Sequence, residues 1–298
     1  MRNIDLKSNG YPLVNSDEQL GRLVPSDPNA PIGDLWAQLK TQGYLWLRGF
    51  FPRQEIIGFR RRFFERMKPT GIVADDTDPS DGFYSGRRDP SGQSTKLLME
   101  LVRTAAYESF CLQPRLWGFY ERLLGGDVYL HKRKIVRQTY PQDPKTTDAH
   151  YDLIYLRGGT DSVLSSWIPL GDVPLEMGGL TYLENSDAFG RKMEADFAAH
   201  SLAFSPKERL NAYNKNMSAT GGIGKDLSAL VSRYNTRWLV ADYEAGDMVI
   251  HTSYMIHAAT QNNSSEGRMR LSTDIRYQRI RDEIDARWQN HWTLDDML

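Results

Sequence analysis

Two residues that commonly bind metals, His150 and Asp152, stand two positions apart in the sequence. On an extended segment, side chains two positions apart project to the same face, so this pair could bind one metal ion. A second histidine from a distant strand would complete a 2-His-1-carboxylate set, which leaves coordination positions open and is typical of non-haem Fe(II) oxygenases. His257 is the candidate, because it follows an apolar run that begins after Gly246 and Asp247. An isolated His-x-Asp is more often a surface pair, so the sequence context has to decide.

Four blocks of sequence supply that context. They are residues 43–51 (GYLWLRGFF), 150–152 (HYD), 167–170 (WIPL) running into 176–180 (EMGGL), and 245–270, which holds AGD, His257 and Arg270. In their order and spacing these blocks resemble the phytanoyl-CoA dioxygenase family of Fe(II)- and 2-oxoglutarate-dependent oxygenases, from about Gly43 to Tyr277. The resemblance implies a double-stranded β-helix (jelly-roll, cupin-like) core that uses Fe(II), 2-oxoglutarate as co-substrate, and O2.

The resemblance also implies that His150, Asp152 and His257 bind the Fe(II). His251 is the nearby competitor, but it lies where relatives usually have an aromatic residue or a histidine that does not bind metal. Related enzymes that halogenate carry a small residue in place of the carboxylate, so Asp152 argues against halogenation. No catalytic residue beyond the metal centre is predicted.

An arginine on the strand after the distal histidine is expected to bind the distal carboxylate of 2-oxoglutarate, because a guanidinium and a carboxylate form two parallel hydrogen bonds. Arg270 and Arg268 are both available, and strand alternation puts them on the same face. We expect Arg270 to have this role. Arg268 directly follows the turn at 262–267 and should lie near the rim, whereas Arg270 is one pleat further in and begins the Arg-x-Ser pattern that relatives show.

Three further contacts to 2-oxoglutarate are expected from the resemblance. Trp167 stands where the family has a tryptophan that reaches the co-substrate; the alternative is a plain core aromatic. Gln138 occupies an amide-donor position on the strand before the metal motif. Relatives commonly carry a hydroxyl two residues after the distal histidine, where this chain has Ala259, so Thr260 must substitute for it or that contact is missing.

For the reaction, the resemblance implies oxidation of an unactivated C–H bond, with 2-oxoglutarate converted to succinate and CO2. Hydroxylation is the default outcome, and desaturation, cyclisation and endoperoxide formation are alternatives because the product depends on how the substrate is placed. The family name points to an acyl-CoA, but the sequence has no clear adenine or pyrophosphate site, which favours a small metabolite of a biosynthetic pathway. Its binding residues are unknown. A non-catalytic barrel that binds a metal or ligand and acts through a partner is the alternative of another class.

A basic run at 131–134 (HKRK), followed by Arg137, has two interpretations. These side chains could neutralise a phosphate or carboxylate of the substrate. Lys and Arg are equally expected on an edge strand, where they protect against aggregation.

Composition places the chain among soluble globular proteins, with 298 residues, 40% hydrophobic and 25% charged. No window approaches the roughly 18 apolar residues of a spanning helix, and the first residues lack the apolar core of a signal peptide. The net charge of -1 gives no field to attract nucleic acid or anionic lipid. The single cysteine, Cys111, excludes an intrachain disulfide and fits a reducing compartment. We expect a cytoplasmic protein with a small-molecule partner, without nucleic acid or membrane partners, and compatible with a homo-oligomer.

Helical patterns come first along the chain and strand patterns second, which predicts one domain over residues 1–298, mainly β with packed helices. Helices are expected at 32–42, 52–67 and 96–124. Short strands are expected at 43–51, 127–130, 134–140, 153–155, 163–168, 180–183, 237–240, 248–251 and 270–279.

Three polar segments fall outside this pattern. Residues 1–33 are expected to form an N-terminal arm, and residues 68–95 a long loop that covers the mouth of the site. Residues 187–236 interrupt the strands and are expected to form an insert or lid over the site. Because glycines and small polar residues bury little apolar surface, the part around 214–225 should be mobile until ligands bind.

Overall fold

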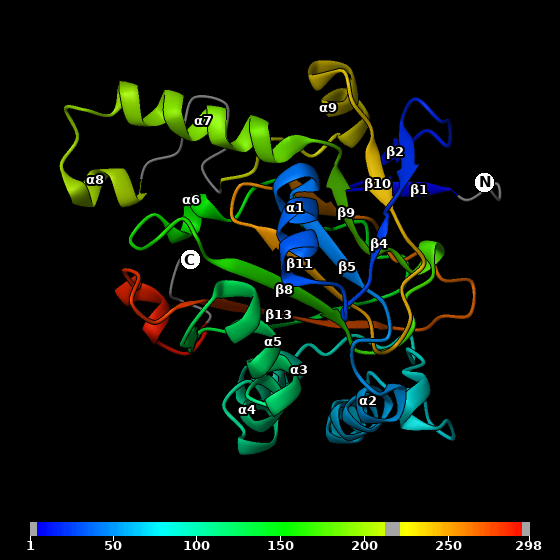
Figure 1. The fold of residues 1–298 in the computed structure, drawn as a ribbon. Coiled ribbons are helices and arrows are strands. Elements are labelled where there is room, and N and C mark those ends of the chain that lie inside the picture. Colours follow the sequence, from blue (N-terminus) through cyan, green and yellow to red (C-terminus); the bar gives the residue numbers. More distant parts are fainter. Residues whose placement is uncertain (1–4, 212–220, 294–298) are drawn as a thin grey trace.

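The computed structural model describes residues 5–211 and 221–293, and its centre consists of two packed β-sheets (Figure 1). The larger sheet has the strand order β4-β5-β11-β8-β13-β6, with β7 also paired to β13, and the smaller has the order β12-β9-β10-β3. The strands of the larger sheet are β4 (Pro25–Ser26), β5 (Tyr44–Leu47), β11 (Met248–Thr252), β8 (Leu164–Pro169), β13 (Arg270–Arg279), β6 (Val128–Leu130) and β7 (Ile135–Thr139). Those of the smaller are β12 (His257–Ala259), β9 (Leu180–Leu183), β10 (Trp238–Val240) and β3 (Leu20–Arg22). The predicted double-stranded β-helix core with packed helices is confirmed.

Strand β13 organises the larger sheet, because it pairs with β8, β6 and β7. Its side chains alternate, as they must on a pleated strand. Leu271, Ile275 and Tyr277 point into the apolar core beneath the helices. Arg270, Ser272, Asp274 and Arg276 occupy the alternate positions, and all four are buried. One face of the strand therefore packs into the apolar core, and the other places buried polar side chains in the space between the sheets.

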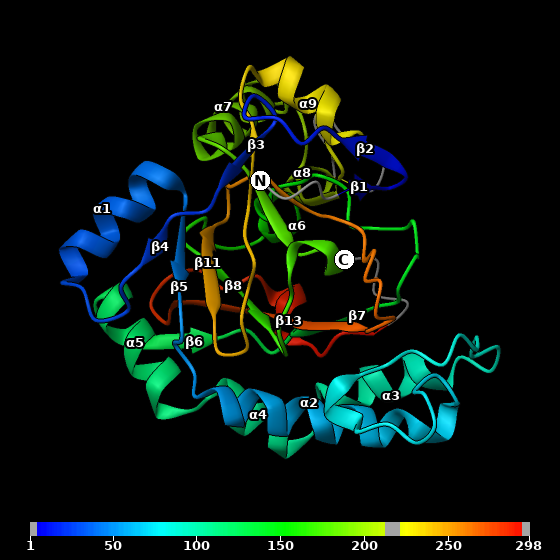
Figure 2. The ribbon, with the colours of Figure 1, turned by 90° about the vertical axis from the view of Figure 1, so that its right-hand side faces the viewer.

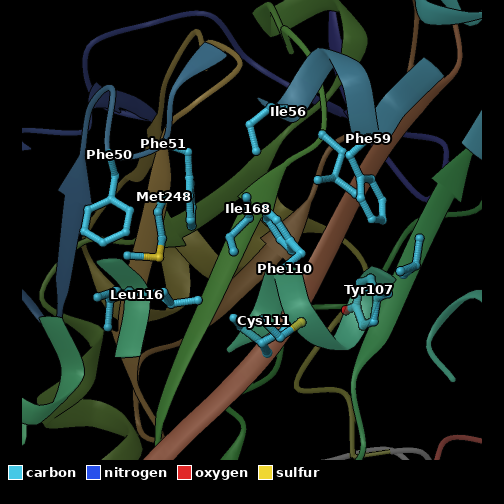
Figure 3. Packing of buried hydrophobic residues seen from close by; sticks show 14 of the residues in the cluster. Phe50, Phe51, Ile56, Phe59, Tyr107, Phe110, Cys111, Leu116, Ile168 and Met248 are labelled. Carbon is cyan, nitrogen blue, oxygen red and sulfur yellow. The ribbon is translucent and has the colours of Figure 1, made fainter. Parts of the chain in front are cut away.

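Helices cover the apolar face of the larger sheet. They are α1 (Ile32–Gln42), α2 (Arg53–Met67), α3 (Gln93–Leu101), α4 (Ala105–Cys111) and α5 (Pro114–Leu124), and Figure 2 shows α2 to α5 together on one side of the sheets. Figure 3 shows Phe110 of α4 near Ile168 of β8, and Leu116 of α5 near Met248 of β11. Burying one such side chain contributes about 1.5 to 3 kcal/mol. This layer therefore gives the barrel a rigid wall behind β8, β11 and β13.

Several predicted elements differ from the structure. The helix expected at 96–124 is three helices, because Thr104 caps α4 by accepting a hydrogen bond from the backbone N–H of Tyr107, and Pro114 starts α5. The strand expected at 153–155 is a short helix, α6 (Leu153–Leu156). The helix at 32–42 has its predicted bounds and ends at Gly43 with φ +78°.

The polar segments are more ordered than their composition suggests. The arm at 1–33 contributes β1 (Leu6–Ser8), β2 (Tyr11–Leu13), and the parallel partners of β10 and β5, namely β3 and β4. The insert contains α7 (Ser186–His200), α8 (Pro206–Asn211) and α9 (Leu227–Tyr234), and α7 and α9 lie on the side of the sheets opposite α2 to α5 (Figure 2). None of the helices in the described ranges is long and apolar enough to cross a membrane.

The segment expected to be mobile, 214–225, falls partly outside the described residues. Within the described part, Ile223 donates a backbone hydrogen bond to Ala149, and Gly224 bridges to the same residue. Gly221 packs against Ile154, where an added Cβ would lie 2.4 Å from that side chain. This glycine cluster is therefore packed against the segment that precedes His150 and Asp152.

Candidate metal centre and co-substrate site

His150 and His257 are brought together by backbone pairing. The N–H of each donates to the carbonyl of the other, at 3.0 and 2.9 Å, although 107 positions of sequence separate them. Their rings consequently lie side by side, with centroids 4.3 Å apart. This pairing between two distant parts of the sequence is what turns a local His-x-Asp into a three-residue site.

Asp152 joins the two histidines by a different route from the one predicted. Its backbone is helical (φ -69°, ψ -29°), because it stands at the start of α6 and not on an extended strand. The carboxylate still faces the imidazoles, with Oδ1 3.6 Å from Nε2 of His150 and 3.7 Å from Nε2 of His257. All three residues are buried, and one ligand atom from each lies within 4.8 Å of the others. Among the described residues, this is the group with metal-binding geometry.

The donor atoms of this group suit Fe(II). Nδ1 of His150 lies 2.8 Å from the carbonyl of Asp148, and Nδ1 of His257 lies 2.9 Å from the carbonyl of Met255. Each Nδ1 must therefore carry the proton, which leaves Nε2 with a lone pair directed at the carboxylate. Burial, followed by the neighbouring histidines, holds the pKa of His257 well below its usual value, so the ring is neutral as a metal ligand must be.

The distal oxygen of Asp152 is held by the protein. Oδ2 accepts hydrogen bonds from the Ser165 hydroxyl at 2.5 Å and from Nη2 of Arg276 at 2.8 Å. Burial acts to raise the pKa of Asp152, but Arg276 and the histidines outweigh it and keep that pKa well below its usual range. The carboxylate is therefore charged, with Oδ1 turned to the imidazoles.

His251, the competing histidine, takes a place beside this group. Its Nε2 lies 3.5 Å from Asp152 Oδ2 and has no hydrogen-bond partner, and its Nδ1 lies 2.9 Å from the hydroxyl of Tyr182. It thus faces the oxygen that Ser165 and Arg276 hold, while His150 and His257 face the other one.

Arg270 has the features expected of a carboxylate-binding residue. It is buried, and its guanidinium donates to Thr139 Oγ1 at 2.9 Å and to the carbonyl of Gly178. In the part of the chain that the structure describes, its Nε has no hydrogen-bond partner, and neither does the hydroxyl of Ser272, two residues along the same face of β13. Burial, assisted by Arg137, lowers the pKa of Arg270 to about 10, so it is a cation at neutral pH. Two buried donors without partners, arranged as Arg-x-Ser, fit an incoming carboxylate.

Arg268 lies at the rim. Its side chain is 38% exposed, its Nε is 2.7 Å from a Glu266 oxygen, and its guanidinium lies 4.9 Å from the centre of the Phe83 ring. The order along the strand is therefore the expected one, with Arg270 deeper than Arg268.

The other three predicted contact residues have different surroundings. Trp167 is buried on the face of β8 that also carries Ser165, and it packs on Tyr243 with ring centroids 4.8 Å apart. Thr260 is buried beside Arg270, because its N–H donates to the carbonyl of Gly179 next to the Gly178 carbonyl that Arg270 contacts.

Gln138 is turned away from Arg270. Its amide nitrogen lies 3.1 Å from the sulfur of Met269, on the opposite face of β7 from Thr139, whose hydroxyl contacts Arg270. Residues 138 and 139 point to opposite faces of the strand, although Gln138 and Arg270 both line the same cavity.

Sequence reasoning missed three residues of this site. Arg276 and Ser165 contact Asp152, and Asp274, on the inward face of β13, forms an ion pair with Arg137. Alternation along 270–279 gives a signal for Arg276, since it falls on the same face as Arg270, Ser272 and Asp274.

The sequence matches the family model described as Phytanoyl-CoA dioxygenase (PhyH) over residues 39–270. No curated protein sequence matches the chain.

Solved structures of similar fold include those of three enzymes. The alpha ketoglutarate dependent epimerase SnoN from nogalamycin biosynthesis, solved with Fe3+, alpha ketoglutarate and nogalamycin RO, is 18% identical with a TM-score of 0.53, over 85% of each chain. The carbocyclase SnoK from the same biosynthesis is 18% identical with a TM-score of 0.53, over 88% of this chain and 89% of its own. EctD from S. alaskensis, solved with 2-oxoglutarate and 5-hydroxyectoine, is 13% identical with a TM-score of 0.53, over 95% and 86%. At these identities the likeness establishes the fold.

Proposed function

The chain belongs to the phytanoyl-CoA dioxygenase family, and from this membership we propose that it oxidises an unactivated C–H bond of a small molecule, by default through hydroxylation. The protein is an Fe(II)- and 2-oxoglutarate-dependent dioxygenase. In the balanced reaction, substrate, O2 and 2-oxoglutarate give the hydroxylated product, succinate and CO2. The observation that carries the proposal is the convergence of His150, Asp152 and His257, with one ligand atom of each within 4.8 Å of the others.

We assign the metal to Nε2 of His150, Nε2 of His257 and Oδ1 of Asp152. These are the three atoms that face one another while the remaining nitrogens and the other oxygen are bonded to protein groups. When bound, Fe(II) with 2-oxoglutarate and O2 supplies the oxidising power for the C–H bond. Three protein ligands leave room at the metal for the co-substrate and for O2.

We assign the distal carboxylate of 2-oxoglutarate to Arg270 and Ser272. Both offer buried donors that lack a partner, and a charge-assisted contact is strongest where water is excluded. Trp167 lies on the neighbouring strand and Thr260 beside the Gly178–Gly179 turn, so both are assigned to the wall of the same site. Thr139, which already contacts Arg270, orients the guanidinium.

The protein shields this site from bulk water. Tyr44, Tyr182, Trp167 and Tyr243 form a buried aromatic cluster between the sheets, next to His251 and His257. Because the cluster excludes water, it strengthens the ionic contacts of Asp152 and Arg270 and limits loss of oxidising equivalents to solvent.

Hydroxylation is not the only outcome to test. The similar structures include an epimerase and a carbocyclase, which supports keeping desaturation, cyclisation and endoperoxide formation as alternative outcomes for this chain. An acyl-CoA substrate is the remaining alternative that the family name suggests.

The test is succinate formation by the purified protein with Fe(II), 2-oxoglutarate and O2, followed without added substrate and with cell extract. We expect turnover that His257→Ala abolishes and that His200→Ala, a change at an exposed histidine, leaves intact. Mass comparison of extracts treated with the active protein and with His257→Ala would identify the product as a gain of oxygen or a loss of hydrogen. Equal succinate formation by the wild type and His257→Ala would contradict the proposal.

A further inference from the structure

We propose that Arg137 binds a carboxylate of the substrate, which makes the substrate a small carboxylic acid. This inference rests on the proposed function, because it assigns the second guanidinium of the same site. Arg137 is a specificity-determining residue in this scheme, and Arg270 keeps the co-substrate.

The guanidinium of Arg137 is held at one end and free at the other. Its Nε donates to Oδ2 of Asp274 at 2.6 Å, on the inward face of β13. Within residues 5–211 and 221–293, no side chain or carbonyl forms a hydrogen bond with either Nη atom, and the side chain is 36% exposed. Asp274, which is 12% exposed, orients the guanidinium through Nε and leaves the edge with the two Nη atoms available to a ligand. Two parallel N–H groups in a fixed plane match the two oxygens of a carboxylate.

The rest of the basic run has other contacts. His131 bonds to Gln278, Arg133 stacks on Trp288, and Lys134 forms an ion pair with Glu108 at 2.6 Å. These three side chains are buried, and Lys132 is exposed. The surroundings of Arg137 therefore differ from those of residues 131–134. Those four residues as a group neither form a substrate-binding patch nor protect an edge strand against aggregation.

A cavity of about 490 Å³ lies beside β7, and Arg137 and Arg270 both line it. Lys145 lies on its wall as well, and Asp143 is the acidic residue there that has no ion pair. The lining includes Arg270 but none of the three metal-site residues, so the cavity adjoins the co-substrate end of the site. Among the described lining residues, Arg270 and Lys145 against Asp143 leave one net positive charge, which a carboxylate of 2-oxoglutarate would neutralise, and the Arg137 guanidinium is the group that would take a second anion.

Electrostatics favour an anion next to Arg137. Asp274 raises the pKa of Arg137 and Asp152 adds to this effect, so the guanidinium stays charged. Arg137 in turn disfavours the charge on Arg270. Asp274 balances one of the two cations, and the distal carboxylate of 2-oxoglutarate would balance the other. A single negative charge is sufficient at Arg137, because Asp274 already neutralises part of it.

Two sources could supply that carboxylate, namely the substrate and the carboxylate of 2-oxoglutarate next to its keto group. The experiment separates them by measuring two affinities on each protein. Binding of 2-oxoglutarate to the Fe(II)-loaded protein without O2 is followed by its charge-transfer absorption. Binding of phenylacetate and hexanoate, and of their neutral amides, is then measured by calorimetry at saturating 2-oxoglutarate.

We expect the wild type to bind the acids at least about tenfold more tightly than the amides. Arg137→Gln should remove this preference and change the affinity for 2-oxoglutarate less than about twofold, which also shows that the variant is folded. Arg137→Lys keeps the charge for Asp274 but loses the fork, so its preference should be intermediate. Lys132→Gln removes the same charge from an exposed position outside the cavity and should behave as the wild type.

Three results would overturn the inference. They are equal or undetectable binding of acids and amides by the wild type, a loss of 2-oxoglutarate affinity in Arg137→Gln with the acid preference retained, and tighter Arg137-dependent binding of inorganic phosphate than of either acid. The first would remove the carboxylate site, the second would give Arg137 to the co-substrate, and the third would change the ligand class. Failure of the proposed function is distinct, since the wild type would then show neither the charge-transfer absorption nor succinate formation.

Discussion

Oδ2 of Asp152 lies 2.8 Å from Nη2 of Arg276, and both side chains are buried. Arg276 approaches from β13, where its guanidinium also lies 4.4 Å from the centre of the Trp288 ring. Because Arg276 and Ser165 occupy Oδ2, the carboxylate has one oxygen left for the histidine side. Residues of the inward face of β13 thus serve both ends of the site, with Arg276 at the metal ligand and Arg270 at the co-substrate.

Removal of the Arg276 charge should weaken metal binding. We expect Arg276→Gln to lower the affinity for Fe(II) more than about tenfold, because truncating one partner of a buried charge pair typically costs about 2 to 5 kcal/mol. Anaerobic Fe(II) titration by calorimetry measures this directly. Arg279→Gln is the matched control, since Arg279 stands on the same strand and pairs with Asp282 away from the metal group. Unchanged Fe(II) affinity in Arg276→Gln would mean that the pair does not orient Asp152.

Asp152→Gly should abolish both metal binding and succinate formation while the protein still folds. The substitution should also destabilise the fold. Loss of Asp152 leaves the buried charge of Arg276 without its partner, which costs about 3 to 5 kcal/mol. Adding Arg276→Leu should therefore recover stability in chemical denaturation without recovering Fe(II) binding. Full turnover by the Asp152→Gly variant without the second substitution would refute the ligand assignment.

His131 should make stability depend on pH. Burial lowers its pKa to about 4 from an ordinary value of 6.5. Between these values the unfolded chain binds more protons than the folded one, so stability falls as pH drops from 6.5 to 4 and is constant above that window for this group. A lowering of the pKa of this size corresponds to a loss of folding stability on the order of 3 kcal/mol at the acid end of the window. Urea denaturation at pH 7.5 and pH 5 should show a smaller difference for His131→Gln than for the wild type. An equal difference would assign the pH effect to other groups.

Gly178 should tolerate no side chain. Its φ is +68°, and an added Cβ would lie 2.3 Å from the carbonyl oxygen of Thr260 and 2.2 Å from that of Gln261. Backbone atoms cannot move aside as a flexible side chain can, so we expect Gly178→Ala to cost more than about 2 kcal/mol and to weaken 2-oxoglutarate binding through Arg270. Gly49→Ala is the control, because its φ is +60° with open space around the added Cβ, and it should cost about 1 kcal/mol. Similar melting temperatures for the two variants would contradict the steric explanation.

The sequence predicted the parts of the site that depend on motif and alternation. His150, Asp152 and His257 could be singled out because their residue types and context define a metal motif, and the depth order of Arg268 and Arg270 follows from the two-residue period of a strand. The core fold was predictable for a similar reason, since short strands between turns recur along the second half of the chain.

Other features depend on contacts that no local pattern encodes. The helical backbone of Asp152 follows from α6, a turn whose apolar residues Leu153, Ile154 and Leu156 are also compatible with a buried strand. The contact from Arg276 to Asp152 joins residues 124 positions apart. The face that Gln138 occupies is set by the register of β7 on β13, which the sequence of the strand alone does not encode. The order of the glycine cluster comes from pairing with Ala149, which its own composition does not reveal.

Arg270, and not Arg268, should bind the distal carboxylate of 2-oxoglutarate. Arg270 is buried, whereas Arg268 is 38% exposed and lies against Glu266, which would compete with an incoming carboxylate. A buried charge-assisted contact is worth more than an exposed one, and breaking it typically costs about 2 to 5 kcal/mol. We therefore expect Arg270→Ala to raise the 2-oxoglutarate concentration needed for half-saturation more than about tenfold, and Arg268→Ala to change it much less. Titration of 2-oxoglutarate into each Fe(II)-loaded variant without O2, followed by the charge-transfer absorption, gives both values. The reverse ranking would transfer the role to Arg268 and would require the rim of β13 to be the co-substrate site.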